Sequence, residues 1–108
     1  MARFPKSSRI LKKSEFDFLL KTGSGASHAY FAMRWQKGLK RRLGVVVART
    51  IQRAVRRNRI KRIVREFFRN HSEQFPMGDV IVIARSGADG LSSKSIWESL
   101  ATLLERKK

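Results

Sequence analysis

The feature that most limits how this chain can fold is a basic stretch at residues 54–70, AVRRNRIKRIVREFFRN. Its apolar residues recur with the spacing of one helix face, which predicts a helix with one buried side. That side consists of Ile60, Ile63, Val64, Phe67 and Phe68. From Arg53 to Asn70 the chain has seven Arg and one Lys against a single acid, Glu66. Like charges three and four positions apart repel on a helix, so we expect an anionic partner to offset the repulsion.

A second side of the same helix is polar and cationic. It consists of Ala54, Asn58, Lys61 and Arg65, with Arg62 and Arg69 beside it. A solvated helix face usually mixes charges of both signs, and this face has almost no acid. Most of its cations are arginines, whose planar guanidinium matches the geometry of phosphate. This side therefore predicts contact with nucleic acid.

The start of the helix is also cationic. Arg53, Arg56 and Arg57 lie in or near its first turn, where the helix dipole disfavours each cation by about 0.3–1 kcal/mol. A phosphate bound there would meet free backbone N–H groups and arginines together. These arginines therefore lower the stability of the helix start, and a bound anion would reverse that loss.

Charge and composition bound the class of protein. The 108 residues carry a net charge of +17, and the hydrophobic content of 42% is enough for a core. We expect one domain over 1–108 that binds nucleic acid, with a basic and extended segment at 1–13. The chain has no cysteine, which excludes disulfides and thiolate metal sites and fits the cytoplasm. No apolar run is long enough for a membrane span or a signal core.

Hydrophobic periodicity predicts an α/β two-layer sandwich with the order α-β-β-β-α-β-α. Residues 29–35 alternate, with Phe31, Met33 and Trp35 on one side and Tyr30 and Arg34 on the other. We expect Phe31, Trp35, Phe67 and Trp97 in the core, whereas Phe16 and Tyr30 could stack on unpaired bases. The expected elements are a helix at 14–23, a short strand near 24–28, strands at 29–35, 43–49 and 79–85, and helices at 54–70 and 92–108.

Two further predictions concern the last helix and the strand–helix–strand unit. The helix should bury Trp97, Leu100, Ala101 and Leu104, and Ser92 or Ser95 should cap its start. The unit at 43–85 should cross over with the right-handed sense that is general for parallel strands.

The sequence has no recognisable catalytic motif. His28 and His71 are far apart without a ligand cluster, and the acids are scattered singly. We therefore expect no catalytic residue and no metal site in the protein. Three alternatives stay open: a structural or ribosomal RNA-binding protein, a basic helix on a membrane surface, and a metal nuclease that uses His28 or His71.

Residues 42–69, RLGVVVARTIQRAVRRNRIKRIVREFFR, resemble the protein component of bacterial ribonuclease P. LKKSEFDFLLKTG resembles the first helix of that family, and DVIVIAR its last strand. The residues that match the helix motif are Ala54, Val55, Arg57, Asn58, Arg59, Lys61, Arg62, Arg65, Glu66 and Phe67.

The resemblance implies a fold and a function. The fold would be like domain 2 of ribosomal protein S5, with an unusual left-handed strand–helix–strand crossover. The protein would bind the catalytic RNA of ribonuclease P and the 5′ leader of precursor tRNA. The RNA, with Mg²⁺ bound mainly by RNA, would perform the endonucleolytic cleavage that gives the mature tRNA 5′ end. No membrane and no DNA would be involved.

The resemblance also implies site residues. The leader cleft between the basic helix and the sheet would hold Phe16, Leu20, Arg34, Arg49, Ala54, Asn58, Lys61 and Arg65. Catalytic RNA would contact Arg53, Arg56, Arg57, Arg59 and Arg62. Leu20 stands where the family often has an aromatic residue. Arg49 and Thr50 replace a common Lys-Lys pair, so half of that charge is kept.

Overall fold

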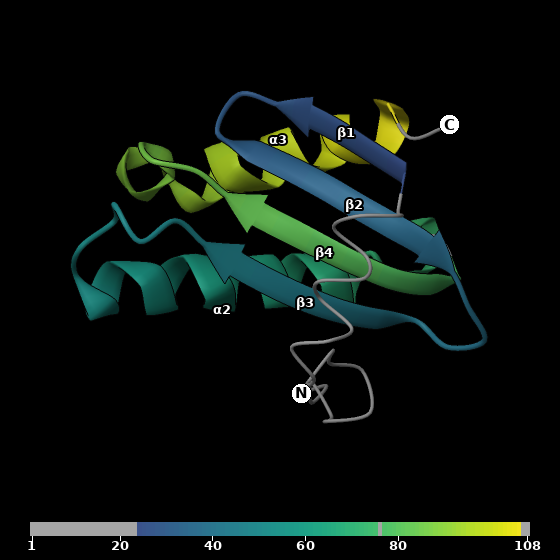
Figure 1. Ribbon diagram of the computed structural model, residues 1–108. Helices are drawn as coiled ribbons and strands as arrows, with labels where there is room; N and C mark the ends of the chain where they lie inside the picture. The colour runs from purple at the N-terminus through teal and green to yellow at the C-terminus, as the bar shows by residue number, and fades with distance from the viewer. Residues whose placement is uncertain (1–23, 76, 107–108) are drawn as a thin grey trace.

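The computed structural model of the protein describes residues 24–75 and 77–106, which form one sheet with two helices packed on the same face (Figure 1). The strands are β1 (Ser24–His28), β2 (Phe31–Lys37), β3 (Arg42–Val47) and β4 (Gly78–Ala84). The helices are α2 (Ala54–Asn70) and α3 (Ser93–Arg106), with short 3-10 turns η2 (Ser72–Gln74) and η3 (Ala88–Gly90). The expected α/β two-layer sandwich is confirmed. The expected first helix, with Phe16 and Leu20, and the segment 1–13 lie outside the described residues.

The strand order is β1-β2-β4-β3, so the last strand in the sequence lies inside the sheet. β4 pairs antiparallel with β2 and parallel with β3, which leaves β3 at an edge. In Figure 1 both β3 and β4 run to the left, β4 lies above β3, and α2 lies behind them. The β3–α2–β4 crossover is therefore left-handed. The general rule for such units gave the wrong hand, and the family resemblance gave the right one.

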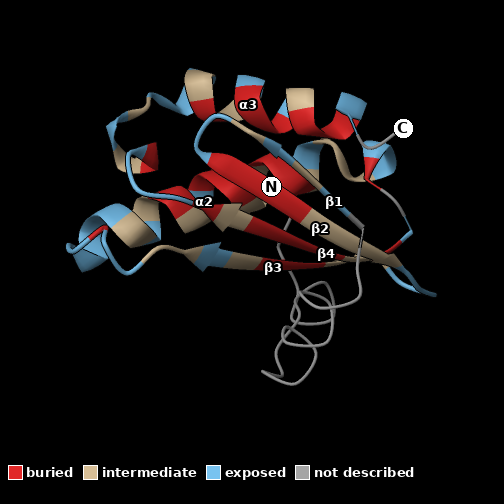
Figure 2. Cartoon of the chain, turned by 45° about the horizontal axis from the view of Figure 1, so that its top comes forward, coloured by how far each residue is buried: buried red, intermediate tan, exposed pale blue. Residues whose placement is uncertain are grey.

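The core lies between the sheet and the two helices (Figure 2). α2 buries the five residues that its periodicity predicts, each 4% exposed or less. Phe31 and Met33 of β2 face them and are fully buried, as the alternation of residues 29–35 predicts. The opposite residues of each strand, among them Arg34, consequently lie on the sheet face away from the helices.

Some predicted boundaries and faces were wrong. β2 begins at Phe31 because Ala29, with a φ of 53°, turns the chain out of β1. α3 buries Ile96, Leu100, Leu103 and Leu104, whereas Ala101 is exposed. Trp97 misled the prediction: it is half-buried at the side of α3, with its ring 5.4 Å from that of Phe67. The Ser92 hydroxyl accepts a hydrogen bond from the Ser95 N–H at 3.1 Å, which confirms Ser92 as the cap.

Candidate nucleic-acid interface

The cationic stripe predicted for α2 lies on one flank of the helix. Its members Ala54 and Asn58 are exposed, and Lys61 and Arg65 are half-buried. Residues on the other flank reach η3 and the start of α3, as described below. Because that other flank faces η3 and α3, and α2 packs behind the edge strand β3 (Figure 1), the stripe lies on the side of α2 away from α3, toward the β3 edge of the described sheet. The helix thus offers a row of polar and cationic groups beside the sheet.

The N-terminus of α2 has no capping side chain and no acid in its first turn. Arg53 is the residue before the helix, and its extended backbone leaves its side chain exposed. A polar hollow of about 310 Å³ lies beside it. Its lining consists of Thr50, Ile51, Gln52, Arg53, Arg56 and Asp89. Free N–H groups and two arginines make this end of the helix favourable for an anion.

Arg56 is paired inside the protein. Its guanidinium donates to the Asp89 carboxylate of η3 at 2.8 Å. That hydrogen bond holds the pKa of Asp89 below its usual value of 3.8. The Arg56 side chain still exposes 55% of its surface, so the pair lies at the surface of the cationic end of α2.

Two more arginines of α2 hold the fold. Arg57 donates to the carbonyl oxygens of Ile51 at 2.7 Å and Gln52 at 2.9 Å, which fixes the turn that leads into the helix. Arg59 donates to the Leu91 carbonyl at 3.2 Å and ties α2 to the segment before α3. Sequence reasoning missed these structural contacts, since their partners are backbone oxygens that no side-chain pattern reveals. Whether these arginines also contact RNA stays a prediction.

Arg34 lies in a row that crosses the sheet on the face away from the helices. Strand register places it between Gly25 of β1 and Ile81 of β4, and Ile81 is followed by Gly44 of β3. β4 therefore lies between β2 and β3, so Arg34 is about 10 Å from β3 along the sheet and on the face opposite α2. Arg49 is exposed in the loop after β3. Of the described cleft positions, Ala54, Asn58, Lys61 and Arg65 lie on α2 and Arg49 lies in the loop after β3, whereas Arg34 lies on β2 on the other face of the sheet.

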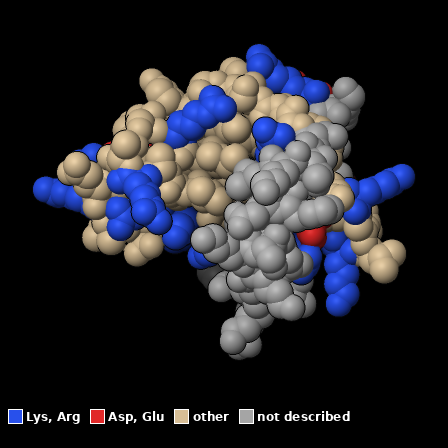
Figure 3. All heavy atoms as spheres, viewed as in Figure 1, with Lys and Arg blue, Asp and Glu red and all other residues tan. Residues whose placement is uncertain are grey.

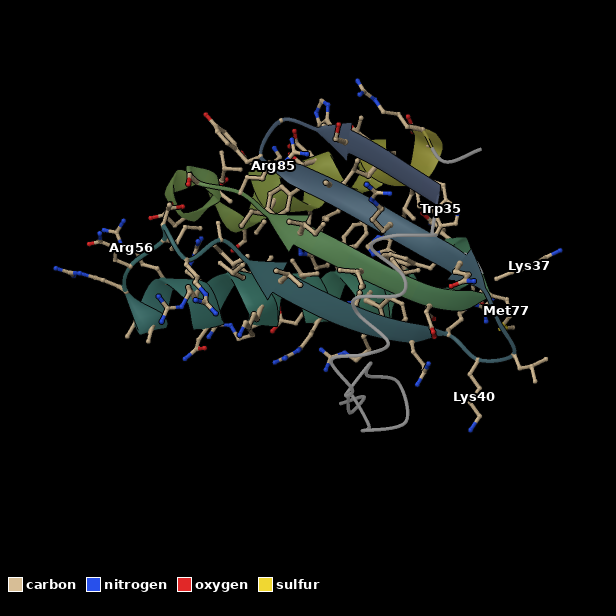
Figure 4. The ribbon with its side chains drawn as sticks, viewed as in Figure 1. Trp35, Lys37, Lys40, Arg56, Met77 and Arg85 are labelled. Atoms are coloured by element: carbon tan, nitrogen blue, oxygen red, sulfur yellow. The ribbon has the colours of Figure 1, made fainter. Side chains whose placement is uncertain are left out.

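The surface is cationic over this part of the molecule (Figure 3). Lys and Arg side chains project from several sides of the face shown, and acidic atoms are sparse. Arg56 and Arg85 extend from one end of the sheet, and Lys37 and Lys40 from the opposite end (Figure 4). Such a surface attracts a polyanion.

The two histidines lie in different parts of the fold. His71 ends α2, with its Nδ1 3.0 Å from the Phe67 carbonyl oxygen and its ring stacked on Phe67 at 4.2 Å. His28 is half-buried at the end of β1. Residues 24–75 and 77–106 contain no group of three or more His, Cys, Asp or Glu that could hold a metal ion. In the same part of the chain, no helix has the length and apolar character that crossing a membrane requires.

The fold and this surface define a class: a small, strongly basic α/β protein with an arginine-rich helix beside a sheet edge, suited to bind RNA. The chain belongs to the ribonuclease P protein family, whose family model, Ribonuclease P, matches residues 4–108. Membership places it among RNA-binding protein components in tRNA processing.

Relatives and solved structures of this family are similar to the chain over most of its length. The "Ribonuclease P protein component" of Geotalea uraniireducens is 36% identical over 105 residues, covering 95% of this chain and 93% of that protein. That of Pseudoalteromonas atlantica is 36% identical over 106 residues, with 95% and 88% covered. The RNase P protein structure from Staphylococcus aureus has a TM-score of 0.88 at 33% identity, covering 95% of this chain and 97% of that chain. The protein from Thermotoga maritima has a TM-score of 0.81 at 33% identity, with 91% and 96% covered.

Proposed function

We propose that this chain is the subunit of ribonuclease P that binds the catalytic RNA and holds the 5′ leader of precursor tRNA. In this way it promotes magnesium-dependent, RNA-catalysed removal of the leader. The observation that carries the proposal is the position of the cationic stripe of α2, beside the free edge of β3 in a protein of this family. A single-stranded leader needs an extended cationic track rather than a deep pocket.

The work is divided between the RNA and the protein. The catalytic RNA, with Mg²⁺ that it binds, supplies the hydrolytic chemistry when the two subunits are assembled. The described residues hold no cluster of metal ligands, so this part of the chain contributes binding and orientation. Asn58 and Lys61 donate hydrogen bonds to the leader backbone, and Arg65 adds a charge-assisted contact to phosphate. Arg53 and Arg62, both exposed, contact the catalytic RNA.

Neutralisation of phosphate is the main physical contribution. Each phosphate that meets an arginine releases condensed counterions, which favours assembly at moderate salt. The protein then reduces the repulsion between the leader and the catalytic RNA, so less Mg²⁺ is needed to bring them together. The like charges along α2 are stabilised by the same contacts.

The test is cleavage of a 5′-extended precursor tRNA at low magnesium. The protein alone, a bacterial ribonuclease P RNA alone, and both together are compared, and the assay is repeated with Asn58→Ala and Arg65→Ala. Lys94→Ala on α3, exposed and away from the β3 edge, is the matched control. Cleavage that needs both subunits and is weakened by the two α2 changes, more so for long leaders, supports the proposal.

Two other results of this assay would contradict the proposal. If the protein leaves the activity of the RNA unchanged, the proposal fails and a general RNA-binding protein is the better account. Cleavage by the protein alone would show an active site in this chain, and His28→Ala and His71→Ala would then locate it.

A further inference from the structure

A second hollow lies on the sheet face away from the helices, separate from the stripe on α2. Its volume is about 330 Å³, and its lining is mostly polar. It lies against β1, β2 and the end of β4, and the residues around it are Gly25, Ala26, Ser27, Ala32, Arg34 and Arg85. Only Arg34 belongs to the leader cleft proposed above. Arg85 has no role there.

The hollow is built by strand register rather than by a loop. Arg34 lies opposite Gly25, and a β-carbon at Gly25 would meet the Arg34 Cδ at 3.2 Å and Nε at 3.3 Å. The missing side chain therefore lets Arg34 lie flat across β1. Arg85 follows β4, and its backbone N–H donates to the Tyr30 carbonyl at 2.8 Å. This bond continues the β2–β4 pairing by one step and places Arg85 directly opposite Tyr30.

Tyr30 directly precedes β2 and lies opposite Arg85, one of the residues around this hollow. The Arg85–Tyr30 hydrogen bond continues the β2–β4 register, so the two side chains lie on the same face of the sheet as neighbours across the strands. The ring lies over Gly87, where an added β-carbon would be 2.7 Å from the Tyr30 Cε1, and the φ of Gly87 is 97°. Tyr30 nevertheless remains 43% exposed. A large aromatic ring is thus supported on one side and open to solvent beside an arginine.

The same end of the sheet is joined to the start of α2. The hydroxyl groups of Thr50 and Ser86 are hydrogen-bonded, which links the loop after β3 to the segment after β4. Arg85 and Arg56, in the first turn of α2, consequently belong to one cationic end of the molecule (Figure 4). An RNA strand that runs from α2 across the sheet would reach this end next.

We infer that Tyr30 and Arg85 form a binding site for an unpaired RNA segment, in which a base stacks on Tyr30 and the neighbouring phosphate lies between Arg85 and Arg34. An exposed ring next to a guanidinium is the usual combination for unpaired RNA, because every base has a face to stack and a phosphate to neutralise. The inference rests on the proposed function: the segment is the part of the leader farther from the cleavage site than the part held by α2.

The test measures the affinity of the assembled enzyme for precursor tRNA with a short leader, which reaches only α2, and with a long leader, which can cross the sheet. The variants are Tyr30→Ala, Tyr30→Phe, Arg85→Gln and Arg65→Ala. Lys94→Gln on α3 is the matched control for loss of one charge. We expect Tyr30→Ala and Arg85→Gln to weaken long-leader binding roughly tenfold and to leave short-leader binding unchanged. Tyr30→Phe should bind as the unsubstituted protein does, because it keeps the ring.

The outcomes separate the two proposals. Long-leader binding that is unchanged in Tyr30→Ala and Arg85→Gln, while Arg65→Ala still weakens it, overturns the inference and leaves the proposed function intact. No effect of any α2 variant or of the protein itself overturns the proposed function. Photocrosslinking of a long leader that carries 4-thiouridine gives a second measurement on the unsubstituted protein. Crosslinks at Tyr30 support the site, and crosslinks confined to α2 overturn it.

Discussion

The Arg56 guanidinium and the Asp89 carboxylate are joined by an ion pair of 2.8 Å that ties the first turn of α2 to η3. Only 19% of the Asp89 side chain is exposed, whereas Arg56 remains largely open. The pair places an acid beside the cationic end of the helix, where a phosphate would otherwise find one more free charge. Asp89 therefore moderates the attraction of this end for RNA.

Asp89→Asn should strengthen RNA binding. The change frees Arg56 for phosphate, so the slope of log affinity against log salt concentration should steepen by about 0.7 for a single-stranded RNA. Titrations over a range of salt concentrations measure this slope. Glu105→Gln near the end of α3 changes the net charge equally and is the control. An equal steepening in both variants would show that net charge alone matters.

The same ion pair should make stability depend on pH in the acid range. The hydrogen bond from Arg56 lowers the pKa of Asp89 in the folded protein from its usual 3.8. A carboxylate with a lowered folded pKa stabilises the fold above its unfolded pKa, and the contribution is lost as the pH falls through the folded pKa. Urea unfolding should therefore separate the unsubstituted protein from Asp89→Asn at pH 7 and show no difference well below pH 3.8. A difference that persists in acid would contradict this account.

Arg57 and Arg62 should respond differently to removal of their side chains. Arg57→Ala loses two hydrogen bonds to loop carbonyls, which should lower the free energy of unfolding by about 2 kcal/mol. Arg62 is exposed and makes no hydrogen bond or ion pair within the described part of the chain, so Arg62→Ala should change stability by less than about 0.5 kcal/mol. Urea unfolding checks both values. Binding of the catalytic RNA should weaken in Arg62→Ala without loss of stability.

Gly78→Ala should destabilise the fold strongly. The φ of Gly78 is 141°, and an added β-carbon would lie 2.1 Å from the Gln36 carbonyl oxygen and 2.6 Å from the Gly38 nitrogen. Both obstacles are backbone atoms that cannot move aside, so the cost should be about 3 kcal/mol or more. Thermal unfolding measures it. Gly90→Ala is the control, because nothing lies within 4 Å of the added atom, and it should be nearly neutral.

Much of the fold could be predicted because its pattern is local. α2 spans the predicted residues and buries the predicted face, because its apolar residues from Ile60 to Phe68 keep the spacing of one helix face. The face of α3 was placed wrongly because Trp97, the largest apolar residue of the helix, packs at its side against Phe67 and His71. The left-handed crossover follows from no local pattern. Only the family resemblance predicted it.

Less of the candidate site than of the fold could be predicted from the sequence. Helical spacing was enough to collect Asn58, Lys61 and Arg65 on one side of α2. The partner of Arg56 is 33 residues away, and no local spacing connects them. Arg85 escaped notice because it becomes a neighbour of Tyr30 only when β4 pairs with β2. Contacts that depend on register between distant strands need a structure to be seen.

The place of β4 inside the sheet has a consequence for how the chain reaches its native state. β3 is made before β4, but among the described strands it pairs with β4 alone, which must insert between β2 and β3. A growing chain that stops before Gly78 has a β1–β2 hairpin and a basic helix with no strand to hold them together. We therefore expect the basic helix to take its position only when synthesis is nearly complete, so that unfinished chains compete poorly for RNA and assembly begins with whole subunits.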